Sequence, residues 1–277
     1  MKRIPVLYFI SIMLLSGMWA CTGSQESKQL INDDVVAEQT VVHNQHLQQY
    51  FQLPSPVELF MFMWDGELDF NPNHLNLVDF AKGYEGSKKK AINLGVYSAD
   101  LAYCTVYEKN QEARNLFSAT IDLAQNLGLT EGFDPVLLDR IDKNIENSDS
   151  LFQITNYSYS KSLTYLQSQD QIQILPYIVY GGWLESLYIS TQSLGDETLT
   201  GNVAVKVVDQ ALLLENLIEF FDYLNFNDEN TLKIMEDLEA LDMIFESIVS
   251  KGDGSMSKDT FSQLKQKVNE IRMGIVK

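Results

Sequence analysis

The sequence of 277 residues has few of the side chains on which covalent cross-linking and acid–base catalysis depend. It contains two cysteines, Cys21 and Cys104, and three histidines. If Cys21 is modified, Cys104 has no cysteine to pair with, so packing must supply the stability of the fold. The sequence also lacks Gly-rich phosphate loops, Gly-x-Ser-x-Gly, Cys-x-x-Cys and His-Glu-x-x-His. We therefore expect no catalytic site, no metal and no other cofactor.

Basic residues are scarce as well. The chain has 20 lysines and arginines against 38 acidic residues, a formal net charge of -18. An acidic surface repels the phosphates of nucleic acids and anionic lipid headgroups, so no nucleic acid is expected as a partner. Cationic partners or divalent ions remain open. A solvated surface that keeps the protein soluble explains the same charge more simply.

The apolar run over residues 4–15 is too short to cross a bilayer as a stable anchor. A short positive stretch precedes it and Ala20-Cys21 follows it, which predicts a signal peptide over residues 1–20. A small residue before a cysteine resembles the lipobox of bacterial lipoproteins, in which the cysteine sulfur receives diacylglycerol and the amino group a third chain such as palmitate. Because Trp19 is bulky for that motif, a plain secretory signal or an uncleaved anchor remains an alternative.

The residues after the cysteine bear on location. Thr22 follows it, and by resemblance to known lipoprotein sorting rules the absence of aspartate there favours the outer membrane. No acidic run follows, so we expect the lipid-anchored protein to face the periplasm. Residues 21–50 are polar and predict a flexible, lipidated tether with an r.m.s. span of about 30 Å. Residues 51–277 are expected to form one helical domain.

Apolar residues recur at helical spacing over most of this domain, which predicts an all-α fold. We expect an antiparallel multi-helix bundle, with two pseudo-symmetric halves as a further option. A capping box at residues 55–58 predicts one helix start. The other helices are expected at about 74–82, 86–108, 110–127, 134–146, 148–168, 171–194, 203–225, 228–250 and 257–275. Residues 180–183 are compatible with a hairpin turn, but the apolar spacing that follows favours a helix.

The option of two halves comes from a short internal similarity. Asp100-x-x-Tyr103 and Glu185-x-x-Tyr188 each follow a glycine by a few residues. A repeat of this kind would relate two helices by a pseudo-twofold axis.

Two predicted helices carry almost no charge. From residue 91 to 107 the only charged residue is Asp100, and from residue 171 to 195 the only one is Glu185. Helices that are apolar on every face are normally buried on every face, so we expect these two at the centre of the bundle. Their glycines would let the two backbones approach closely.

A buried carboxylate needs partners, because its charge is costly to remove from water. One hypothesis is structural: Asp100 and Glu185 accept hydrogen bonds from tyrosine hydroxyls, helix ends or a lysine and fix the register of the helices. The other is a polar site that lines an internal pocket. The side chains expected to form the pocket walls are Tyr97, Tyr103, Trp183 and Tyr188. A metal site is disfavoured, because tyrosine stands where ferritin-like carboxylate sites place histidine.

Three stretches together resemble a family of uncharacterised helical lipoproteins of Bacteroidetes-type bacteria. They are Leu53-Pro54-Ser55-Pro56, the run Ala91-Ile92-Asn93-Leu94-Gly95-Val96-Tyr97-Ser98-Ala99-Asp100-Leu101-Ala102-Tyr103, and Gly181-Gly182-Trp183-Leu184-Glu185-Ser186-Leu187-Tyr188. The resemblance covers residues 50–195 and implies a helical fold and a lipid anchor. It implies no activity.

These observations lead to two functional hypotheses. The first is a non-enzymatic cell-envelope lipoprotein that acts as a helical protein-binding or structural module, anchored through Cys21 and partnered by another envelope protein. The alternative is a small-ligand-binding bundle with an internal pocket near Asp100 and Glu185.

Overall fold

The computed structural model describes residues 56–129, 172–195, 202–225, 228–249 and 256–276, together with Lys143, Ser150, Gln153, Tyr157 and Tyr165. The predicted signal peptide, Cys21, the tether and the helices expected at 134–146 and 148–168 lie outside the described residues, apart from those single positions. The chain divides into two compact units, Met1–Phe51 and Gln52–Lys277, and all the described residues belong to the second.

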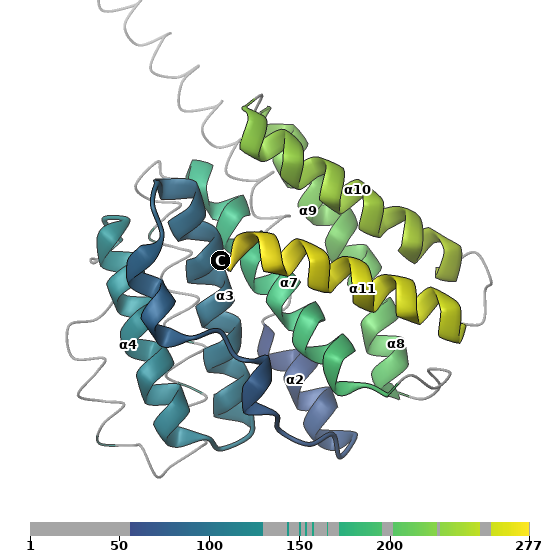
Figure 1. Ribbon diagram of the computed structural model, residues 1–277, viewed down its shortest axis with the longest axis horizontal. Coiled ribbons are helices and arrows are strands. Elements are labelled where there is room, and N and C mark those ends of the chain that lie inside the picture. Colours follow the sequence, from purple (N-terminus) through teal and green to yellow (C-terminus); the bar gives the residue numbers. More distant parts are fainter. Residues whose placement is uncertain are drawn as a thin grey trace, which may run out of the picture. The chain divides into compact units, whose positions relative to one another are not determined.

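The described part of this second unit is all-α, as the sequence predicts, and contains no strand (Figure 1). Its α-helices are α2 (Pro56–Asp65), α3 (Ser87–Val106), α4 (Asn110–Asn126), α7 (Leu175–Ser193), α8 (Asn202–Val208), α9 (Gln210–Leu224), α10 (Glu229–Val249) and α11 (Lys258–Ile275). Short 3-10 turns are η1 (Pro72–His74), η2 (Val78–Gly83) and η4 (Ile172–Ile174).

Most predicted helix boundaries agree with the structure to within a few residues, and three details differ. The hairpin alternative is wrong, because residues 180–183 lie inside α7. The helix expected near 74–82 is instead the turns η1 and η2, where the Asn71 side chain caps the first turn by accepting a hydrogen bond from the Asn73 N–H. The helix expected at 203–225 is interrupted at Asp209 into α8 and α9.

The two nearly uncharged helices, α3 and α7, pack against each other at the centre of the described part (Figure 1). A Cβ atom on Gly95 would overlap the carbonyl oxygen of Ile178, and a Cβ atom on Gly181 would overlap that of Ile92. The contact is therefore reciprocal: the glycine of each helix faces the residue three positions before the glycine of the other. Only glycine permits so close an approach of two backbones. This local twofold relation agrees with the expected similarity between the two segments.

The central pair also sets the direction of the helices. Ile92 contacts Gly181, and further along both helices Asp100 interacts with Glu185, so α3 and α7 run in the same direction. Helices joined by short loops, such as α3–α4 and α9–α10, pack as antiparallel neighbours, as the sequence predicts. The described helices thus include antiparallel hairpins and, at their centre, a parallel pair.

Helix α2 packs on both central helices at their C-terminal halves. Phe60 and Met63 of α2 are fully buried and form a cluster with Ala99 and Tyr103 of α3 and Ile189 of α7. This burial fixes the end of α2, from which residues 66–86 run to the start of α3. We call residues 66–86 the connecting segment.

Candidate functional site

Asp100 and Glu185 are both buried, with 0% of each residue exposed. Asp100 lies on α3 and Glu185 on α7, just beyond the glycine contact. The two carboxyl groups are close enough to share a hydrogen bond. The structure thus brings together the two acids that the sequence places alone in apolar helices.

Glu185 forms a bidentate ion pair with Arg272 of α11. The Arg272 Nε donates to Oε2 at 2.7 Å and to Oε1 at 3.0 Å, and Nη2 donates to Oε1 at 2.7 Å. The guanidinium also lies over the ring of Tyr188, 4.1 Å from its centroid, and donates to the backbone oxygen of His74 at 3.2 Å. The arginine side chain is 8% exposed, so this pair is shielded from water. We call Asp100, Glu185 and Arg272 the acid–arginine cluster.

Asp100 has a different environment. Its Oδ2 accepts the backbone N–H of Asn76 at 2.9 Å, and its Oδ1 meets no donor in the described part of the chain. Burial, and then the neighbouring Glu185 carboxylate, raise the pKa of Asp100 well above its ordinary value. Burial raises the pKa of Glu185 too, but the Arg272 guanidinium opposes that shift. The surroundings of Asp100 therefore favour its protonated form, whereas Arg272 stabilises the negative charge of Glu185.

The tyrosines expected as pocket walls bind backbone instead. Tyr97 donates its hydroxyl to the carbonyl of Leu77 at 2.6 Å, and the hydroxyl of Tyr103 accepts the backbone N–H of Asn71 at 2.9 Å. Both tyrosines are fully buried. Their partners belong to the connecting segment, so these hydroxyls attach that segment to α3.

Two further side chains complete the predicted set. Tyr188 is half-buried beneath Arg272 and so joins the acid–arginine cluster. Trp183 is buried, but among the described residues its indole N–H meets no acceptor and it has no contact with the acids. Five of the six predicted residues thus surround or form one polar centre, and Trp183 stands apart.

The sequence did not reveal the partners of the acids. Asn76 lies in an irregular segment, and its Nδ2 donates to Tyr84, whose hydroxyl donates in turn to the carbonyl of Val276. The position of Arg272, in contrast, could have been recognised from the sequence. It follows Leu264 and Val268 at steps of four residues, and so occupies a core position of an amphipathic helix. An arginine at such a position needs a buried anion.

We expect Asp100→Asn to leave the domain folded and to flatten the dependence of its stability on pH. An asparagine mimics the protonated acid, since it can accept from Asn76 N–H and donate to Glu185. Because the pKa of Asp100 is raised on folding, the wild-type stability is full below the ordinary value near 4 and falls as the pH rises towards the folded value. Urea unfolding at a series of pH values would measure this slope.

The surface substitution Asp122→Asn serves as the control and should retain the wild-type slope. A loss of several kcal/mol for Asp100→Asn at acidic and neutral pH alike would mean that Asp100 works as a charged group.

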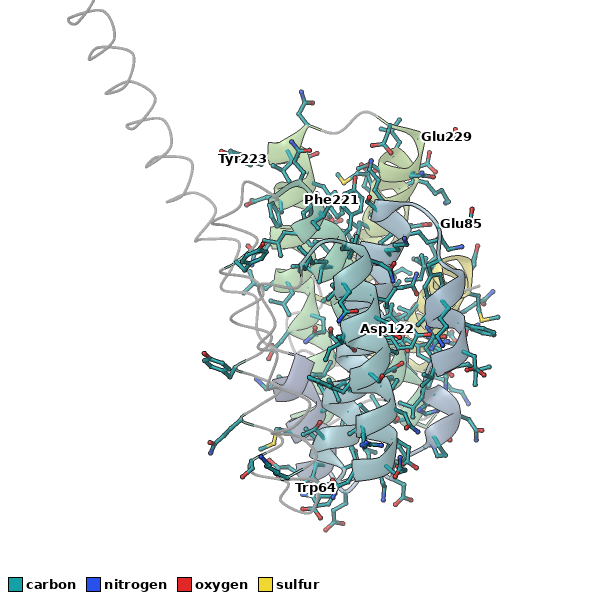
Figure 2. All side chains as sticks on the ribbon, turned by 90° about the vertical axis from the view of Figure 1, so that its left-hand side faces the viewer. Trp64, Glu85, Asp122, Phe221, Tyr223 and Glu229 are labelled. Atoms are coloured by element: carbon teal, nitrogen blue, oxygen red, sulfur yellow. The ribbon has the colours of Figure 1, made fainter. Side chains whose placement is uncertain are left out.

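A second feature lies where α2 and α3 end, at one end of the bundle, marked by Trp64 in Figure 2. It is a surface depression of about 760 Å³, which we call the α2–α3 groove. Its lining residues are Trp64, Asp65, Glu67, Leu68, Asp69, Phe70, Tyr107, Glu108 and Lys109. None of these residues was singled out from the sequence.

The backbone is strained on both sides of this groove. After α2, Leu68 N–H donates to Met63 O and Glu67 adopts φ 57°; after α3, Lys109 N–H donates to Cys104 O and Glu108 adopts φ 57°. This hydrogen bond is that of a Schellman helix end, whose left-handed position normally holds glycine. Helix α4 follows the usual pattern, with Gly128 in that position at φ 74°. Strained backbone of this kind is more frequent at functional sites than elsewhere, so Glu67 and Glu108 make this surface a candidate site.

Glu108→Gly is expected to stabilise the domain by about 1 kcal/mol, because glycine adopts the left-handed conformation without the steric cost of a Cβ atom. Thermal or urea unfolding would measure the gain. The same change at the exposed helix position Glu239 should destabilise by about 1 kcal/mol. If both variants lose stability equally, the strain assigned to Glu108 does not exist.

Comparisons with known proteins give no relative from which a role can be transferred. The chain matches no protein-family model, no curated protein and no solved structure. Among the described residues, no three histidine, cysteine or acidic side chains are grouped so that they could hold a metal ion. No helix in that part of the chain has both the length and the apolar character needed to cross a membrane.

Proposed function

We propose that this protein is a non-enzymatic lipoprotein of the bacterial outer membrane, facing the periplasm, whose helical domain binds another envelope protein or supports envelope architecture. The proposed localisation rests on the apolar run 4–15, Ala20-Cys21 and the polar residues 21–50. Its membership of the Bacteroidetes-type lipoprotein family remains part of the same proposal.

The proposal rests on the fact that most polar atoms of this centre are bound by the chain itself. Glu185 is bound by Arg272, Asp100 by the Asn76 N–H, and the Tyr97 and Tyr103 hydroxyls by backbone of the connecting segment. A ligand pocket would need these polar atoms to face an empty space. Because the chain itself occupies them, a structural role of the acids is favoured over a small-ligand pocket at this place.

The connecting segment supplies a surface for a protein partner. Leu77, Val78 and Phe80 are 62%, 36% and 45% exposed, on a segment that the polar centre holds in place. Apolar side chains held on a fixed backbone lose little further entropy on binding, which favours association with another protein.

Photo-crosslinking in cells tests the proposal. A photoreactive amino acid at position 77 should give one discrete protein adduct in the membrane fraction, identified by mass spectrometry. The matched control is position 243, which is 72% exposed on α10 and should give none. Cys21→Ser should release the protein from the membrane and abolish the adduct.

Absence of an adduct at position 77, combined with stabilisation of the purified chain by a metabolite, would contradict the proposal. It would favour the alternative of a ligand-binding bundle near Asp100 and Glu185.

A further inference from the structure

His74 lies half-buried in the connecting segment, at the point where the turn η1 contacts α7 and α11. Its ring Nδ1 lies 3.4 Å from the hydroxyl of Ser193 on α7, and its backbone oxygen accepts from Arg272 on α11. Its Nε2 lies 3.0 Å from Nδ2 of Asn71, within the same turn. Both ring nitrogens of this histidine therefore take part in holding the connecting segment on the helices.

The hydrogen bonds of Asn71 determine which ring nitrogen of His74 carries the proton. Asn71 Oδ1 accepts the backbone N–H of Asn73 at 3.0 Å and the side-chain amide of Asn73 at 3.1 Å. Because a backbone N–H can only donate, this atom of Asn71 is the oxygen, and the atom that faces His74 is the NH₂ group. His74 Nε2 must therefore accept a hydrogen bond, and the proton of the neutral imidazole lies on Nδ1, facing Ser193.

Protonation of the imidazole removes this acceptor. An imidazolium donates from both nitrogens, so its Nε2–H would meet the NH₂ group of Asn71, which also donates. Rotating the Asn71 amide would turn an oxygen towards the ring, but it would remove the acceptor that caps η1 at the Asn73 N–H. Either response breaks a hydrogen bond within residues 71–75, which we call the histidine turn.

The charged side chains that act on the ring are both cations. They are Arg272 and Lys265, and both belong to α11. Burial, and then the charges of Arg272 and Lys265, lower the pKa of the His74 imidazole below its ordinary value near 6.5.

The acids and the tyrosine packed nearby do not compensate a positive charge on His74. Glu185 is bound by Arg272, and the surroundings of Asp100 favour its protonated form. The ring of Tyr188 lies 6.2 Å from that of His74, but its face already carries the Arg272 guanidinium. In the described part of the chain no carboxylate is bound to the His74 ring.

We propose that His74 is a pH switch of the connecting segment: in acid its protonation opens the histidine turn and weakens partner binding at Leu77. The turn ends two residues before Leu77, so its opening leaves the backbone next to the exposed apolar side chains less ordered. A partner then has to order this backbone on binding, which costs affinity. The effect on the partner rests on the proposed function, whereas the opening of the turn does not.

The direction and size of the opening follow from linkage. Because the pKa of His74 is lowered in the closed turn, the closed form has its full stability above the ordinary value near 6.5 and loses stability as the pH falls below it. If the imidazole recovers its ordinary pKa on opening, the opening constant rises by up to about 30-fold between pH 7.5 and pH 5. Asp100 does not cause this loss, because its raised pKa makes stability fall in the other direction, as the pH rises.

Amide hydrogen exchange of the purified full-length chain, followed by NMR at pH 7.5 and pH 5, tests the opening. The readouts are the amides of Asn71, bound to the Tyr103 hydroxyl, and of His74, bound to the carbonyl of Asn71. After correction for the intrinsic exchange rates, their protection should fall at least about 3-fold in acid. The amides of α7 should keep their protection, because the opening is local.

Two variants assign the response to the contact between His74 and Asn71. His74→Gln retains an acceptor for the Asn71 amide but takes up no proton, so the acid loss should disappear, although His43 and His46 are still present. Asn71→Asp retains the oxygen that caps Asn73 and presents a carboxylate to the ring. It should reverse the response, with the turn better protected at pH 5 than at pH 7.5.

Photo-crosslinking at position 77 in isolated membranes at the same two pH values tests the effect on the partner. The adduct yield should fall at least about 2-fold at pH 5 in the wild type and stay constant in His74→Gln. The loss is expected to be partial, because the Leu77 carbonyl keeps its hydrogen bond from Tyr97.

Each step of the inference has a result that contradicts it. Equal protection of the histidine turn at both pH values, the same acid loss in His74→Gln, or a loss that extends to the amides of α7 would overturn the switch. An opened turn with a constant adduct yield would overturn the effect on the partner. Absence of the adduct at both pH values would instead contradict the proposed function, and the exchange measurement would still decide whether His74 opens the turn.

Discussion

Arg272→Ala is expected to destabilise the domain by about 3–5 kcal/mol, the cost of leaving a buried charge without its partner. Glu185 is fully buried, and its ion pair with Arg272 is the compensation for its negative charge in the described part of the structure. Loss of the arginine also removes the hydrogen bond to His74 and the contact with Tyr188. Because a whole domain is stable by about 5–15 kcal/mol, such a loss would leave the variant close to unfolding. Urea unfolding at neutral pH measures it.

The double variant Glu185→Leu with Arg272→Met is the control for this prediction. Replacing both charges with apolar side chains of similar size should restore most of the lost stability, because no unpaired charge remains. A single variant Arg272→Ala that stays within about 0.5 kcal/mol of wild type would show that Glu185 is not charged or not buried.

Gly181→Ala is the second substitution with a large expected effect. The new Cβ atom would overlap the backbone carbonyl of Ile92, and backbone cannot move aside as a side chain can. Helices α3 and α7 would have to separate, at a cost of about 1–3 kcal/mol or more for overpacking. This cost exceeds the helix propensity of about 1 kcal/mol that alanine adds relative to glycine.

The neighbouring glycine supplies a matched control. A Cβ atom on Gly182 would lie 3.5 Å from the carbonyl oxygen of Gly95, an ordinary contact. Gly182→Ala should therefore be tolerated and gain up to about 1 kcal/mol from helix propensity. Equal stability of the two variants in thermal unfolding would contradict the close approach at Gly181.

The two central helices could be predicted because their near-absence of charge is a property of each segment alone. Two segments with one acid each among apolar residues can be recognised without knowing their neighbours, and the structure buries both Asp100 and Glu185. The glycines of the same segments indicated a close contact. That they face each other in a parallel pair could not be deduced, since it depends on the path of the whole chain.

The core position of Arg272 could be recognised in the sequence, but which acid it pairs with could not, for the same reason. Arg272 is distant from Glu185 along the chain, and the Asn76 N–H is a backbone group that no side-chain pattern reveals. The α2–α3 groove was missed because helix ends are usually recognised by glycine. Glu67 and Glu108 hold that position instead, so their conformation becomes visible only in the structure.

Amide hydrogen exchange at Asn76 tests the central claim most directly, namely that the buried acids hold the connecting segment on the helices. In the wild-type chain this amide, bound to Asp100, should exchange only with global unfolding, and Asp100→Ala should make it exchange by local opening. An Asn76 amide that exchanges in the wild type as fast as an unstructured amide would contradict the account.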